Sequence, residues 1–134
     1  MPSERVQALQ RSFGAFQRGE DGRGLEIYSP DVVFDTGGIE GVIRGHEGIL
    51  RGREMYTAAF QRWRLDVTEI FEVAEAVIVG ARERAIGHAS GIPVEHIRYW
   101  RYEFDGDKVA RLTIYLDRDE AVADAHAPRP RGDP

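Results

Sequence analysis

The first candidate for chemistry in this chain is an aspartate at the end of a short apolar strand. Asp35 follows the strand-forming residues Val32–Phe34 and precedes the turn-forming residues Thr36–Gly38. A carboxylate flanked by apolar side chains at a pocket mouth is partly desolvated, which favours its protonated form and suits a general base. Asp35 is therefore our candidate base. The alternative is structural, because aspartate is common in turns and can simply end a strand.

A later stretch is predicted to form a strand with two different faces. Period-two alternation groups alternate side chains of this strand on one face: His96, Arg98, Trp100, Tyr102 and Phe104. We expect this face to be interior, so that Trp100 forms a pocket wall and Arg98 and His96 lie toward the mouth. The alternatives are a plain core role for Trp100 and a solvated or hydrogen-bonded His96.

The sequence Arg82–Glu83–Arg84 alternates in charge along another predicted strand. Because successive side chains point to opposite faces, either both arginines or the glutamate point inward, and the sequence leaves both open. An inward Arg82 needs an anion to offset its lost hydration, and Asp35 or a substrate carboxylate would serve. We assign Arg82 and Arg98, with Asp35, to the candidate catalytic group. The alternative is an exposed ladder of cross-strand ion pairs.

Three aromatic side chains complete the candidate ligand site. Phe16 belongs to an apolar helical stripe, Tyr56 to a second stripe, and Tyr28 to the segment before the first strand. We expect all three to contact a ligand, and either tyrosine hydroxyl can reach one. The alternative places the two tyrosines at the edge of the core.

Helices are predicted before any long strand. Apolar residues recur every three or four positions within Ser3–Arg18, and Ser3 stands where a helix cap belongs. A compact second helix is predicted at Leu25–Tyr28, and a third helix at His46–Trp63 after a Gly41–Gly45 loop.

Strands follow the helices. Four β-like stretches are predicted: Leu65–Val73, Ala76–His88, Pro93–Phe104 and Lys108–Leu116. A hairpin signal joins the last two, and Asp117 is placed to cap a final helical turn through Ala125. Helices followed by an antiparallel meander indicate an α+β fold with the helices on one face of a curled sheet. We expect one domain over residues 1–125 and a mobile tail over 126–134.

Composition excludes several function classes. The 134 residues carry a formal net charge of -5 and no cysteine. Nucleic acid is not expected as a partner, and disulfides, thiolate metal sites and cysteine nucleophiles are excluded. The four histidines lie far apart in the sequence, so we predict no metal, and no cofactor motif is present. No signal peptide or membrane span is recognisable, so we expect a cytoplasmic protein.

Five fragments occur along the chain in a characteristic order: Phe13–Gly19, Pro30–Asp35, Arg44–Ile49, Tyr102–Val109 and Tyr115–Arg118. Together they resemble the SnoaL-like branch of the nuclear-transport-factor-2-like superfamily, over roughly residues 6–123. The resemblance implies a cone-shaped roll of a curved, mostly antiparallel sheet. Three N-terminal helices would pack on its concave face, and the open end would admit a ligand.

The resemblance implies less about activity, because members include a steroid isomerase, polyketide cyclases, an epoxide hydrolase, dehydratases and binding proteins. The base of the steroid isomerase matches Asp35, or Thr36 if the alignment slips by one. Its two oxyanion donors match Ser12 and Trp100, so neither donor is kept. The polyketide cyclases' histidine also matches Trp100 and is missing.

Two hypotheses follow. The first is a cofactor-free isomerase, cyclase or hydratase that acts on a hydrophobic cyclic substrate, with Asp35 as the base. The second is a non-catalytic module that binds a small hydrophobic organic ligand. We also expect a homodimer through the outer face of the sheet, as the resemblance implies, because Ile97 and Tyr99 would otherwise leave apolar surface exposed.

Overall fold

The computed structural model describes residues 3–36 and 41–126, and for residues 55–63 it describes the backbone. Four helices occur in these ranges: α1 (Glu4–Gln17), α2 (Asp21–Leu25), α3 (Gly45–Ala59) and α4 (Arg118–His126). The predicted cap of the first helix is confirmed, since the Ser3 hydroxyl accepts a hydrogen bond from the Val6 amide at 3.2 Å. At the other end of the chain, the Asp117 carboxylate accepts from the Asp119 amide at 3.2 Å.

The described strands form one six-stranded sheet in the order β2-β1-β6-β5-β4-β3. Their bounds are β1 (Tyr28–Asp35), β2 (Val42–Arg44), β3 (Phe60–Val73), β4 (Ala76–Gly87), β5 (Pro93–Asp105) and β6 (Lys108–Tyr115). All neighbours pair antiparallel except β1 and β6, which pair parallel. The α+β class, the antiparallel meander and the curved sheet are therefore confirmed.

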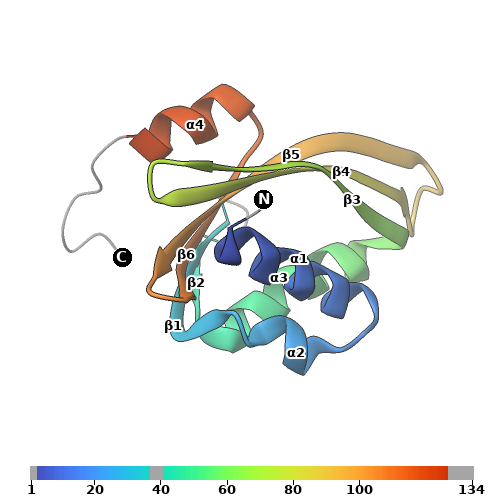
Figure 1. The fold of residues 1–134 in the computed structure, drawn as a ribbon. Helices are drawn as coiled ribbons and strands as arrows, with labels where there is room; N and C mark the ends of the chain where they lie inside the picture. The colour runs from blue at the N-terminus through green and yellow to red at the C-terminus, as the bar shows by residue number, and fades with distance from the viewer. Residues whose placement is uncertain (1–2, 37–40, 127–134) are drawn as a thin grey trace.

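The sheet curves over α1, α2 and α3, which lie on its concave side, whereas α4 lies on the opposite side (Figure 1). The main core fills the space between the concave face and the first helices, with Leu9, Val32, Val79 and Val109 almost fully buried. A smaller core joins the convex face to α4 through Ile78, Tyr115 and Ala121. The expected packing of the three N-terminal helices on the concave face is confirmed. The C-terminal helix α4 covers the convex face, where Ala121 packs with Ile78 and Tyr115.

Element boundaries differ from the sequence-based expectations in three places. The second helix ends at Leu25, and Tyr28 instead begins β1. The predicted Gly41–Gly45 loop contains the short strand β2, which pairs with β1 through Val42–Arg44. The third helix ends at Ala59, where the chain continues directly into β3. In each case a neighbouring strand supplies backbone hydrogen bonds that local patterning does not reveal.

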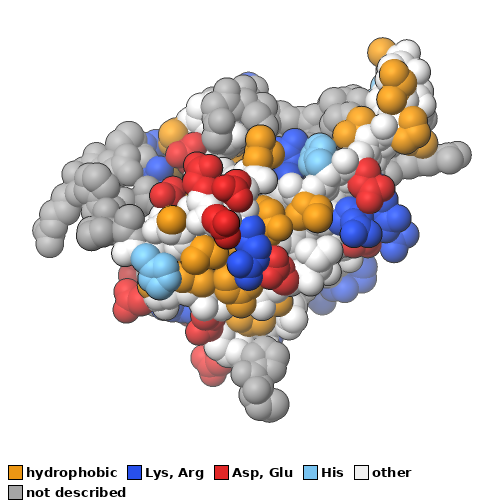
Figure 2. Space-filling view, turned by 90° about the horizontal axis from the view of Figure 1, so that it is seen from above, with side chains coloured by type: hydrophobic (Ala, Val, Ile, Leu, Met, Phe, Trp, Pro, Cys, Tyr) orange, Lys and Arg blue, Asp and Glu red, His pale blue; other side chains and the backbone are white. Residues whose placement is uncertain are grey.

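Charged and hydrophobic side chains are interspersed on the outer side of the molecule, seen from above in Figure 2. The ion pair of Arg118 with Glu69, at 3.0 Å, joins α4 to β3 there. Tyr99 packs against the core under α4, while residue Ile97 is 42% exposed. A homodimer through this face stays a prediction. Within the described residues, no helix is both long and apolar enough to cross a membrane.

Candidate functional site

A cavity of about 510 Å³ lies between the concave face of the sheet and helices α1 and α3. Its apolar lining residues are Phe13, Phe16, Phe34, Ile49, Gly52, Leu65, Trp100 and Leu112. Its polar lining residues are Gln17, Tyr28, Arg53, Arg64, Asp66 and Tyr102. The cavity is therefore an apolar space with a few polar groups, which is the usual composition of a small-molecule site.

Strand β5 supplies one wall of the cavity. Trp100 and Tyr102 are buried and line the cavity, as the alternation of side chains predicts. The Phe13 ring of α1 meets the Tyr102 ring edge to face, with ring centroids 6.2 Å apart. The predicted inward face of β5 is thus confirmed at Trp100 and Tyr102.

Two buried tyrosines, Tyr28 and Tyr102, line the cavity. Burial raises the pKa of Tyr28 to about 12, and the interaction with Tyr102 opposes this rise. Burial, together with the interaction with Tyr28, raises the pKa of Tyr102 well above its usual value. Both hydroxyls stay protonated at neutral pH, so the Tyr28 proton can be donated to an oxygen in the cavity.

Arg53 lies where α3 meets α1 and α2. Its Nη1 lies 3.1 Å from Oδ1 of Asp21, and its Nη2 donates to the Phe16 carbonyl at 3.3 Å. The guanidinium also lies over the Phe16 ring, 4.6 Å from its centroid. These contacts hold a permanent positive charge at the cavity edge.

The opposite edge of the cavity is formed by β3, the last strand of the sheet. The Gln17 side chain donates to the Leu65 carbonyl at 3.2 Å and so links the end of α1 to this strand. Beside it, hydrogen bonds from Arg84 and Arg64 lower the pKa of Asp66. A carboxylate held in its ionised form by two arginines is a weak proton acceptor.

Asp35 does not line the cavity. Phe34 faces the cavity, and the next residue along a strand must face the other way. Asp35 accordingly lies on the convex side, where its Oδ2 is 3.4 Å from Nη2 of Arg111. Thr36 follows the end of β1, and its hydroxyl donates to the Gly41 carbonyl at 2.7 Å. The expected placement of Asp35 is therefore corrected, and its role as a base stays an untested prediction.

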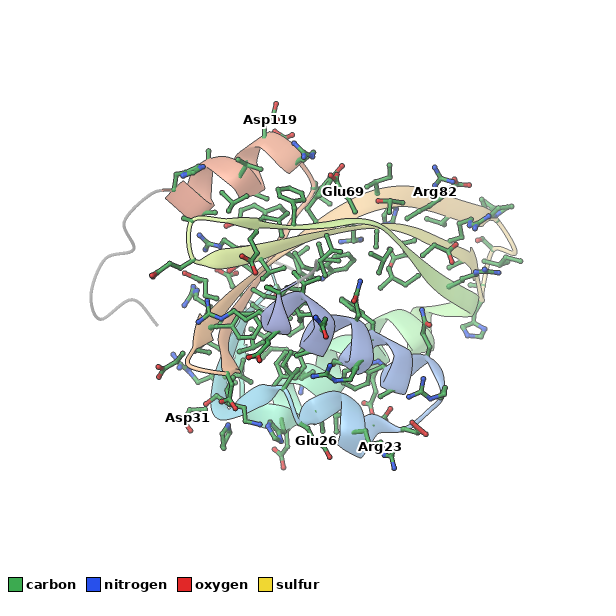
Figure 3. All side chains as sticks on the ribbon, in the orientation of Figure 1. Arg23, Glu26, Asp31, Glu69, Arg82 and Asp119 are labelled. Carbon is green, nitrogen blue, oxygen red and sulfur yellow. The ribbon has the colours of Figure 1, made fainter. Side chains whose placement is uncertain are left out.

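Arg82 also lies on the outer face. It points away from α1, α2 and α3 (Figure 3) and pairs with Glu95 at 3.4 Å. Glu83 is the inward member of the charged trio, with a side chain only 2% exposed. The open alternative is thus decided by packing: the two arginines form exposed cross-strand pairs and the glutamate is buried.

Arg98 and His96 gather around Glu83 on the inward face. Nε of Arg98 lies 3.0 Å from Oε1 of Glu83, and Nε2 of His96 contacts the same oxygen. Neither Arg98 nor His96 lines the cavity. Both side chains point inward, as expected. Their partner, however, is the buried carboxylate of Glu83, to which the sequence analysis assigned no role.

Of the other expected ligand contacts, Phe16 and Tyr28 line the cavity, and the Tyr56 side chain lies outside the described residues. Tyr102 and Arg53 were missed as site residues. The sequence does hold an indication for Arg53, because this charged residue falls in the apolar helical stripe that includes Ile49. Among the described residues, no group of three or more His, Asp or Glu side chains is placed to hold a metal ion.

A comparison with known protein families shows the family to which this chain belongs. The model of the SnoaL-like domain matches residues 9–112. The chain belongs to the SnoaL-like domain family. None of the curated proteins compared with this SnoaL-like domain matches it at the sequence level.

Solved structures share the fold of this SnoaL-like domain. An NTF2-like protein of unknown function from Burkholderia pseudomallei is 20% identical, with a TM-score of 0.75 over 94% of this chain and 100% of that one. TerC co-crystallised with polyporic acid is 19% identical, with a TM-score of 0.74 over 93% and 100%. A protein of ketosteroid isomerase-like fold from Catenulispora acidiphila, in complex with trimethylamine, is 14% identical, with a TM-score of 0.69 over 96% of each chain. At these identities the likeness concerns the fold alone.

Proposed function

We propose that this SnoaL-like domain binds a hydrophobic ring compound in its cavity and donates a hydrogen bond from Tyr28 to an oxygen of that compound. The observation that carries the proposal is that the buried tyrosines Tyr28 and Tyr102 line a mostly apolar cavity. A buried hydroxyl is costly without a partner, so a donor facing an apolar cavity favours ligands with an acceptor at that point.

The size and walls of the cavity support a ligand with one or more rings. A volume of about 510 Å³ lies within the range of small-molecule sites, roughly 300–1,000 Å³. Phe13, Phe16, Phe34 and Trp100 surround it with aromatic surface. Flat aromatic walls pack well against flat rings. A structure of the same fold, TerC, was co-crystallised with polyporic acid.

A second candidate function is a cofactor-free isomerase, cyclase or hydratase. It is favoured by the presence of Arg53 and Tyr28 in the lining of the same cavity, because a donor and a cation together stabilise an oxygen that gains negative charge in the transition state. The general base is the weak point of this candidate. Asp66, the one carboxylate among the described lining residues, is held by arginines, and Asp35 lies on the other face of the sheet.

Calorimetric titration with 2-acetonaphthone and 2-ethylnaphthalene tests the binding proposal. Both should bind, because both fill the apolar cavity, and the ketone should bind more tightly through its carbonyl oxygen. Tyr28→Phe should weaken binding of the ketone about tenfold, as expected for one lost hydrogen bond, and leave the affinity for the hydrocarbon unchanged. Tyr115→Phe is the matched control, because it removes a buried tyrosine hydroxyl from the other face, where that hydroxyl bonds Asp124 at 2.9 Å. Failure of both compounds to bind would contradict the proposal.

The catalytic candidate is tested with the same ketone in heavy water. A base in the cavity would remove a methyl proton, form the enolate and return a deuteron, so the methyl signal would decrease in the NMR spectrum. Exchange faster than in buffer, and lost in Tyr28→Phe, would support an enzyme. Tight binding with no accelerated exchange would favour the binding module.

A further inference from the structure

The described residues that line the cavity include two cations, Arg53 and Arg64, and one anion, Asp66. The whole chain, by contrast, has a formal net charge of -5. The cavity lining is thus more cationic than the chain as a whole, and cations on a cavity wall attract anions.

Arg53 is the cation placed to act on a bound ligand. It lines the cavity, and the ring of Phe16 and the Phe16 carbonyl hold its guanidinium in place. The side chain of its ion-pair partner, Asp21, is 48% exposed. Water therefore screens the carboxylate more than the guanidinium, which is 28% exposed, and the pair leaves positive potential on the cavity side.

The charge of Arg53 reaches the oxygen that would meet the ligand. The positive charge of Arg53 acts to lower the pKa of the Tyr28 hydroxyl, against the larger effect of burial. The same field stabilises any negative oxygen that accepts a hydrogen bond from Tyr28. Burial keeps the tyrosine itself protonated, so the negative charge has to come from the ligand.

We propose that the ligand of this cavity is an organic acid bound in its ionised form, a ring compound whose carboxylate or enolate oxygen lies between the Tyr28 hydroxyl and the Arg53 guanidinium. The inference rests on the proposed function, since it specifies the chemistry of the same cavity. A charge-assisted hydrogen bond is stronger than a neutral one, and the apolar walls would exclude an ion that lacked such partners.

The test compares 2-naphthoate with 2-naphthamide by calorimetry at neutral pH. These probes have the same ring system and nearly the same shape, and they differ in charge. We expect the carboxylate to bind at least about tenfold more tightly, as a charge-assisted hydrogen bond allows. Arg53→Gln should abolish this preference while the amide still binds. Arg23→Gln is the matched control, because Arg23 is an exposed arginine of α2 that points away from the sheet (Figure 3).

A second variant separates a charge effect from damage to the fold. Asp21→Asn removes the carboxylate that pairs with Arg53 but keeps the cation. We expect Asp21→Asn to increase the preference for 2-naphthoate, because less of the positive potential is neutralised. A purely structural role for the pair would make Asp21→Asn reduce binding of both probes alike, which would overturn the inference even if Arg53→Gln failed to fold.

The outcomes also separate this inference from the proposed function. Equal affinity for the two probes would overturn the organic-acid inference and leave the ring-binding cavity intact. Failure of both 2-naphthoate and 2-naphthamide to bind would overturn both. Retention of the carboxylate preference in folded Arg53→Gln would assign the preference to another cation and overturn the role of Arg53.

Discussion

Arg111 and Asp35 form an ion pair on the convex face of the sheet, with Nη2 and Oδ2 3.4 Å apart. The Arg111 side chain is 10% exposed and that of Asp35 is 32% exposed, so the arginine depends on its carboxylate partners more than the aspartate does. Glu103 is the second carboxylate near Arg111, at 3.9 Å. This network stabilises the packing of β1, β6 and β5 and lies on the far side of the sheet from the cavity.

The first prediction concerns Asp35→Asn. The variant keeps the shape of the side chain and removes its charge, so we expect a loss of about 1 kcal/mol in unfolding free energy, since Glu103 still partners Arg111. Affinity for 2-acetonaphthone should stay unchanged, because Asp35 is on the other face. A thermal melt and a calorimetric titration check the two parts. If Asp35→Asn has normal stability but loses ketone binding or methyl exchange, Asp35 belongs to the functional site and this prediction is wrong.

The second prediction is a loss of stability in alkaline solution. The folded pKa of Tyr28 is raised to about 12 from a usual value of 10.0, so the folded state holds its proton more tightly than the unfolded state. The stability from this tyrosine is fully present below about pH 10 and is lost as the pH rises toward 12. Urea unfolding at several pH values measures the slope. Tyr28→Phe should reduce the slope, and an unchanged slope would show that other groups dominate.

The third prediction concerns the close contact of α3 with β1. A methyl group at Gly52 would overlap the Phe34 ring, which lines the cavity. We expect Gly52→Ala to lose about 1–3 kcal/mol of stability through overpacking and to weaken 2-ethylnaphthalene binding as the ring moves into the cavity. Gly22→Ala is the control, because Gly22 lies in helix α2 with open space around it and should gain up to about 1 kcal/mol. If Gly52→Ala, like Gly22→Ala, lowers neither stability nor 2-ethylnaphthalene binding, the close contact between Gly52 and Phe34 is contradicted.

The sequence by itself determined the class of fold and much of one cavity wall. Strong periodicity identified the first helix, the four long strands and the inward face that includes Trp100 and Tyr102. These features depend on local patterning, because a side chain's direction along a helix or strand is fixed by the backbone repeat. The same rule already implied that Phe34 and Asp35 cannot both face the cavity.

Only the tertiary structure decided which side chains meet. Tyr28 and Tyr102 lie far apart in the sequence and line the same cavity because β6 holds β1 and β5 on either side of it. Alternation could not say whether Glu83 or its flanking arginines point inward, since a strand has two faces and the choice depends on what packs against each. The Glu83 carboxylate is buried because Arg98 and His96 reach it from the neighbouring strand, and no local pattern encodes that partnership.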